Sequence, residues 1–186
     1  KRLAKHNCYV RLNSRLGQIL KERILQHGLK TIATHLSVKE KSFYHGIWKS
    51  RYNLAHLLKL IGLFDLSLLN IYDEIQSLSF RPTTKSTKEI VLPSNFSELF
   101  YLAGLFFGDG STKKFVVGKP ELKEKCISIC QKLGITTTYV ERSNRTPEVL
   151  TNDSLVYLLK ALFDYPTKQK SHHIIINDLI FRAPKM

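Results

Sequence analysis

The feature that most constrains the fold is an apolar stretch near the middle of the chain, Phe100-Tyr101-Leu102-Ala103-Gly104-Leu105-Phe106-Phe107-Gly108-Asp109-Gly110-Ser111. As a helix it would be apolar almost all round, so it must be buried. Gly104 and Gly108 lie four residues apart, which opens one face to the close approach of a second helix. Glycine destabilises a helix interior by about 1 kcal/mol relative to alanine, so this contact must offset the loss. The pattern therefore predicts a helix–helix interface at Gly104 and Gly108.

The end of this helix carries a carboxylate in an unfavourable place. Gly110 suits the left-handed position that ends a helix, which puts Asp109 at the negative end of the helix dipole. A carboxylate held there favours a bound cation. The alternative is an Asp-Gly turn in which Asp109 is merely solvated. The residues alone leave both interpretations open.

The chain is strongly basic, and its charge is unevenly distributed. The 186 residues include 29 Lys and Arg against 15 Asp and Glu, a net charge of +14. Residues 1–50 alone hold 11 basic and 2 acidic side chains, a balance of +9. We expect a polyanionic partner, with nucleic acid ahead of an anionic membrane surface. A charge that serves only solubility is the alternative.

The composition also indicates the compartment. Three cysteines do not make a disulfide framework, which favours a reducing setting. The strongest apolar stretch, residues 99–107, is far shorter than the roughly 20 residues of a membrane span, and no secretory signal opens the chain. We expect an intracellular protein of the cytoplasm or nucleoid without a membrane partner. Because 43% of the residues are hydrophobic, the chain can build a core.

Residues 1–76 predict a small helical module of the helix-turn-helix type. Ser14 is a plausible N-cap for a first helix that ends at Gly28, a second helix covers 29–36, and a third runs from about 39 to 48 after a turn at Ser37. An ordinary helical bundle is the alternative. The polar side chains expected to reach a DNA major groove are those of Lys39, Lys41, Ser42, Tyr44, His45, Lys49 and Arg51.

The second half of the chain has a different character. Residues 77–95 contain two prolines and many hydroxyl side chains, which indicates a linker before a C-terminal half-domain at 96–186. There the pattern predicts helices at 97–108, 120–133 and 153–163, strands near 113–118 and 172–177, and a strand or hairpin over 135–150. The expected fold class is α+β, with helices on one side of a small sheet.

At this point the residues resemble a known family. The stretch 102–110, Leu-Ala-Gly-Leu-Phe-Phe-Gly-Asp-Gly, is similar to the LAGLIDADG motif of intein-encoded homing endonucleases and keeps its final Asp-Gly. Residues 90–93 and 98–101 look like the lead-in to that motif, and residues 166–172 and 179–184 look like the segment that joins two repeats. The resemblance covers about residues 90–186, and helix-turn-helix segments accompany some members.

The resemblance implies a site-specific endonuclease that cleaves double-stranded DNA with Mg²⁺. It would make Asp109 the catalytic metal-binding acid, with the carbonyl of Gly108 near the metal. Lys170 would be the basic residue near the scissile phosphate, with Lys168 as a substitute. Because the chain carries one motif, cleavage of both strands would need a homodimer or a second repeat on a longer polypeptide. The chain ends look like cuts from such a polypeptide.

Further basic side chains are candidates for contacts with the DNA backbone. Lys113 and Lys114 follow the motif directly, whereas Arg142 and Arg145 flank a polar turn that could equally be a solvated hairpin tip. Two functions remain as alternatives to the endonuclease. One is an inactive DNA-binding protein or regulator on a degenerate endonuclease fold, and the other is an RNA-intron maturase.

Overall fold

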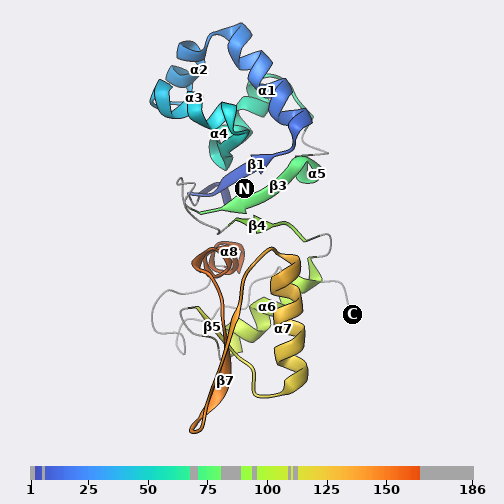
Figure 1. Ribbon diagram of the computed structural model, residues 1–186. Coiled ribbons are helices and arrows are strands. Elements are labelled where there is room, and N and C mark those ends of the chain that lie inside the picture. Colours follow the sequence, from blue (N-terminus) through green and yellow to red (C-terminus); the bar gives the residue numbers. More distant parts are fainter. Residues whose placement is uncertain are drawn as a thin grey trace. The chain divides into compact units, whose positions relative to one another are not determined.

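The chain forms two compact units, which divide between Thr83 and Thr84. The computed structural model describes residues 3–5, 7–67, 71–80, 89–93, 96–108, 110 and 113–163 (Figure 1). We describe each unit by itself. The division falls inside the stretch that the sequence indicates as a linker. The predicted strand at 172–177 lies outside the described residues.

The N-terminal unit combines helices with short strands. In chain order its elements are the 3-10 helix Leu3–Lys5, β1 Tyr9–Leu12, α1 Ser14–His27, α2 Leu29–His35, α3 Glu40–Trp48, β2 Arg51–Asn53, α4 Leu54–Leu63, α5 Ile71–Glu74 and β3 Ile75–Ser79. Helices thus occur at each of the three places where the sequence predicts them. The assignment of α1 to α3 to the helix-turn-helix class stays a prediction.

Local capping explains where α1 begins and ends. Asn13, rather than Ser14, is the N-cap, and its side chain accepts a hydrogen bond from the Leu16 backbone N–H at 3.1 Å. Gly28 ends the helix with φ of 87°, a conformation that other residues rarely adopt. Between these caps, one face of the helix buries Leu16, Leu20 and Ile24.

A small antiparallel sheet is the part of this unit that sequence analysis missed, so the unit is not a purely helical module. Strand β1 pairs with β2 on one side and with β3 on the other. Val10 and Leu12 point into the core, but a four-residue strand offers too little alternation to be recognised. Strand β3 also extends into the stretch that the sequence indicates as a linker. The hydroxyl side chains of Ser77 and Ser79 suggested a loop there, but both are buried in the strand.

The C-terminal unit has a three-stranded antiparallel sheet, against which α6 and α7 pack. Its described elements are β4 Ile90–Val91, α6 Ser97–Gly108, β5 Lys114–Val116, α7 Pro120–Lys132, β6 Thr138–Arg142, β7 Arg145–Leu150 and α8 Asp153–Phe163. The sheet order is β5-β7-β6, and β6 and β7 form a hairpin (Figure 1). The helices lie close to the boundaries that the periodicity predicts.

Aromatic and aliphatic side chains build the core of this unit. Phe106 of α6 and Phe115 of β5 are almost fully buried, and their ring centroids lie 5.7 Å apart. Phe100 and Phe107 of α6 both contact Phe163 of α8 with edge-on geometry. Cys126 and Cys130 on α7 are free thiols and both are buried.

None of the described helices is long and apolar enough to cross a bilayer.

The turn between α2 and α3 allows a direct test of this backbone. Ser37 is exposed and has φ of 57°, a left-handed conformation that disfavours side chains with a Cβ atom. We therefore expect Ser37→Gly to raise the free energy of unfolding by about 0.5–1 kcal/mol in urea denaturation. The matched control is Ser42→Gly inside α3, which should lower it by a similar amount because glycine is a poor helix former. A loss of stability from Ser37→Gly would contradict the turn geometry.

Candidate nucleic-acid interface

The exposed side of α3 carries most of the side chains that the sequence predicts for nucleic-acid contact in the N-terminal unit. Phe43 and Ile47 anchor the helix in the core, which leaves the opposite side in solvent. Spacing of three or four residues brings four of the exposed side chains to one side of the helix. These four are Lys41, Tyr44, His45 and Trp48. Together with Lys21 of α1, they form what we call the α3 face. Lys39, Ser42 and Lys49 are also exposed and flank it.

Arg51 does not belong to this surface, which corrects the sequence-based prediction. Its side chain is only 8% exposed, because β2 carries it into the interior of the unit. The guanidinium donates a hydrogen bond to the Ser79 Oγ of β3. It also lies 5.8 Å from the centroid of the Tyr9 ring on β1. Arg51 thus links β2 with β1 and β3 and has a structural role.

Trp48 and Lys21 are members of the α3 face that sequence reasoning missed. The Trp48 side chain is 55% exposed, and the Lys21 ammonium lies 3.2 Å from the centroid of its ring. Tyr44, one turn earlier, is 41% exposed, and its ring centroid lies 5.8 Å from that of Trp48. The sequence did contain a signal for Trp48, because it follows Tyr44 by four residues and therefore lies on the same polar side of the helix.

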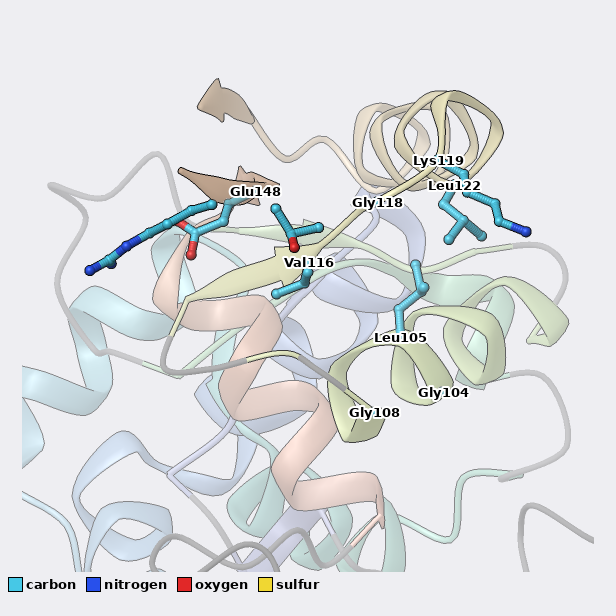
Figure 2. A pocket seen from close by; sticks show the side chains of 10 residues that line it. Gly104, Leu105, Gly108, Val116, Gly118, Lys119, Leu122 and Glu148 are labelled. Carbon is cyan, nitrogen blue, oxygen red and sulfur yellow. The ribbon is translucent and has the colours of Figure 1, made fainter. Parts of the chain in front are cut away.

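Helix α6 packs against α8 through Phe100 and Phe107, but the face that carries its two glycines is open among the described residues. A Cβ atom added at Gly104 or Gly108 would meet nothing within 4 Å. The two glycines line an open hollow of about 850 Å³ between α6, β5, β7 and the start of α7. Figure 2 shows Leu105 rising from α6 into this hollow and Leu122 reaching into it from α7. The close helix contact at Gly104 and Gly108 therefore stays a prediction.

The basic side chains after α6 are held by carboxylates of the same unit. The Lys113 ammonium lies 2.6 Å from Asp153, and the Lys114 ammonium lies 2.9 Å from Glu148. The hydrogen bond from Lys114 is the main reason why the pKa of the Glu148 carboxyl lies below its ordinary value. Both ion pairs reduce the positive charge that these lysines can offer to a phosphate.

Arg142 and Arg145 face each other across the tip of the β6–β7 hairpin, and both are exposed. This position is compatible with contact to a nucleic-acid backbone and equally with a solvated tip. Asp109, Lys168 and Lys170 lie outside the described residues. Within the part of the chain that the structure describes, no cluster of three His, Cys, Asp or Glu side chains could hold a metal ion.

The sequence of this chain is similar to parts of three longer proteins. It is 32% identical over 178 residues to elongation factor 2 of Methanopyrus kandleri, which covers 95% of this chain and 14% of that protein. It is 34% identical over 130 residues to a probable translation initiation factor IF-2 of Thermococcus kodakarensis, covering 65% of this chain and 11% of that protein. The corresponding factor of Methanocaldococcus jannaschii is 35% identical over 120 residues, 60% of this chain and 10% of that protein.

The chain therefore spans no more than 14% of the length of any of these relatives. No family model matches the chain, and no solved structure matches it significantly.

These relatives overturn the resemblance to intein-encoded LAGLIDADG endonucleases. All three are named as translation factors, and none is named as a nuclease. The prediction of a homing endonuclease that cleaves double-stranded DNA with Mg²⁺ is therefore wrong. The two alternatives, an inactive DNA-binding regulator and an RNA-intron maturase, are wrong as well. The roles of Asp109, Lys170 and Gly108 were implied by that resemblance, and the described residues do not test them, since Asp109 and Lys170 lie outside those residues. The physical reason is that small and apolar residues before an Asp-Gly turn suit any tightly packed helix that ends there.

The open face of α6 allows a test of its glycines. We expect Gly104→Ala to raise the free energy of unfolding by about 0.5–1 kcal/mol, because alanine favours the helix and meets no obstacle. Gly110→Ala is the matched control and should lower it, because its Cβ atom would lie 2.7 Å from the backbone of Phe106. Urea denaturation of both variants gives the comparison. A destabilising Gly104→Ala would instead indicate that a second helix covers this face.

Proposed function

We propose that this chain is an RNA-binding segment of a larger, translation-factor-like protein. In this proposal the N-terminal unit contacts the phosphates of a folded RNA through the lysines of the α3 face and the other exposed cations of α1 to α3. The single observation that carries the proposal is the exposed basic surface of α1 to α3. The exposed cations there are Arg15, Lys30, Lys39, Lys41 and Lys49.

The charge distribution supports a phosphate-bearing partner. Residues 1–50 have a balance of +9, from 11 basic and 2 acidic side chains. On α1 to α3 the exposed acidic residues are Glu22 and Glu40. The side chain of Gln18 donates a hydrogen bond to Glu22. Such an imbalance attracts a polyanion over the range of a Debye length, about 10 Å at 0.1 M salt.

The names of the relatives favour RNA over DNA. One relative is named as an elongation factor and two as initiation factors, so the shared segment is not tied to one step of translation. A segment common to both kinds of factor would serve a task that both steps share. Binding to folded RNA is such a task, and it requires the cationic surface that this unit carries.

The proposal concerns binding and not nucleotide hydrolysis. The sequence contains no G-x-x-x-x-G-K loop followed by Ser or Thr, the motif that cradles nucleotide phosphates in many GTP-binding proteins. Any Mg²⁺ in the complex would be bound by the RNA, because phosphate oxygens hold this ion with most of its water shell intact.

The proposed role in translation also implies a location. An RNA-binding segment of a translation factor would act in the cytoplasm, where translation takes place.

Binding to a labelled RNA hairpin, followed by fluorescence anisotropy over a range of salt concentrations, tests this proposal. The logarithm of the binding constant should fall linearly with the logarithm of the salt concentration. Lys41→Ala combined with Lys49→Ala should reduce the slope by about 2 and weaken binding about tenfold at low salt.

The control variant combines Lys119→Ala and Lys125→Ala, two exposed lysines of the C-terminal unit. It should bind the hairpin like the unchanged chain. Equal effects of the two double variants would show that binding follows net charge and not the α3 face. Tighter binding to a DNA duplex of the same sequence than to the RNA would overturn RNA as the partner.

A further inference from the structure

Trp48 and Tyr44 form an exposed aromatic pair that the phosphate contacts of the proposed function do not use. The two side chains are 55% and 41% exposed and lie one helical turn apart on α3. Their ring planes are inclined at 60°, with centroids 5.8 Å apart. A single exposed aromatic residue is common on protein surfaces, but an adjacent pair leaves a larger apolar area in water. The pair therefore calls for an explanation beyond folding.

Lysines lie close to this pair, on α1 and on α3 itself. The Lys21 ammonium lies 3.2 Å from the centroid of the Trp48 ring, so a positive charge already occupies one side of the indole. Lys41 and Lys49 are exposed at the two ends of the same helix, and the His45 ring lies 6.0 Å from that of Tyr44. Aromatic rings among cations are the combination with which proteins bind unpaired nucleotides, since each nucleotide has a flat base and an anionic phosphate.

The same surroundings argue against other occupants. An apolar helix docked on Trp48 would remove the charges of Lys21, Lys41 and Lys49 from water without compensation. A cationic ligand would be repelled by those charges and would compete with Lys21 for the ring. An acidic peptide would pair with the lysines but would leave the aromatic rings without a flat partner. An unpaired base with its phosphates satisfies both the rings and the lysines.

We propose that an unpaired nucleobase of a folded RNA stacks on Trp48, with Tyr44 beside it. This inference rests on the proposed function and specifies the part of the RNA that is recognised: a loop or a bulge, whose bases are free to stack, rather than a continuous duplex. The long side chain of Lys21 moves off the indole when the base arrives. Its ammonium then pairs with a flanking phosphate.

The test uses the fact that Trp48 is the chain's single tryptophan, so its fluorescence reports on this site alone. An RNA hairpin with an unpaired loop should quench the fluorescence of Trp48 as it binds. A blunt RNA duplex of equal length should bind through its phosphates with little quenching. Quenching that is equal for the hairpin and the duplex, or absent for both, would overturn the stacking site.

Variants supply a second readout by fluorescence anisotropy with labelled RNA. Trp48→Ala should weaken hairpin binding about tenfold or more and change duplex binding little, because alanine removes the stacking surface and no charge. Trp48→Phe should restore most of the affinity. Leu63→Ala on α4 is the matched control, since Leu63 is 44% exposed in the same unit but outside the α3 face. Circular dichroism of each variant confirms that it is folded.

The outcomes separate the two proposals. If the unchanged chain binds RNA with the expected salt dependence but Trp48→Ala binds the hairpin equally well, the stacking site is wrong and the proposed function stands. If the unchanged chain binds neither the hairpin nor the duplex, the proposed function and the stacking site both fall. A Leu63→Ala variant as weak as Trp48→Ala would also contradict stacking, since the effect would then be one of general apolar surface.

Discussion

The tight reversal of the chain between α3 and β2 determines which side of α3 faces solvent. Only Lys49 and Ser50 separate the helix from the strand, and Ser50 adopts a positive φ of 48° to make the turn. The space is so narrow that a Cβ atom at Gly46 would lie 2.8 Å from the carbonyl oxygen of Arg51. Because β2 is then paired with β1, the helix cannot rotate without breaking the sheet. Phe43 and Ile47 stay inside, and the aromatic pair stays outside.

Arg51 illustrates how this reversal sorts residues of similar chemistry. It lies two residues after Lys49, yet the strand carries its guanidinium into the interior, where it bonds to Ser79. Lys49 remains exposed. A buried guanidinium is tolerated only where polar groups accept its hydrogen bonds. This arginine therefore stabilises the sheet and adds little to the positive charge on the surface of the unit. Net charge by itself therefore overstates the cationic surface of the unit.

Much of the local structure could be predicted from periodicity, but several long-range features could not. Helix α6 spans the residues that the apolar pattern indicates, and Gly28 ends α1 as expected. The sheet of the N-terminal unit was missed because its strands are three to five residues long and pair across large sequence separations. The interpretation of the 102–110 stretch failed for a related reason. A local motif describes how a helix packs and ends, and several functions can use the same packing.

The sequence by itself determined the positions of most helices, the concentration of positive charge near the N-terminus and the apolar character of α6, because these follow from local composition and spacing. Only the tertiary structure decided which charged groups stay available. It buried Arg51 and paired Lys113 and Lys114 with carboxylates. It also placed Lys21 over Trp48. Each of these results depends on residues brought together from distant parts of the chain, and the free energy of burial or pairing arises only once that contact exists.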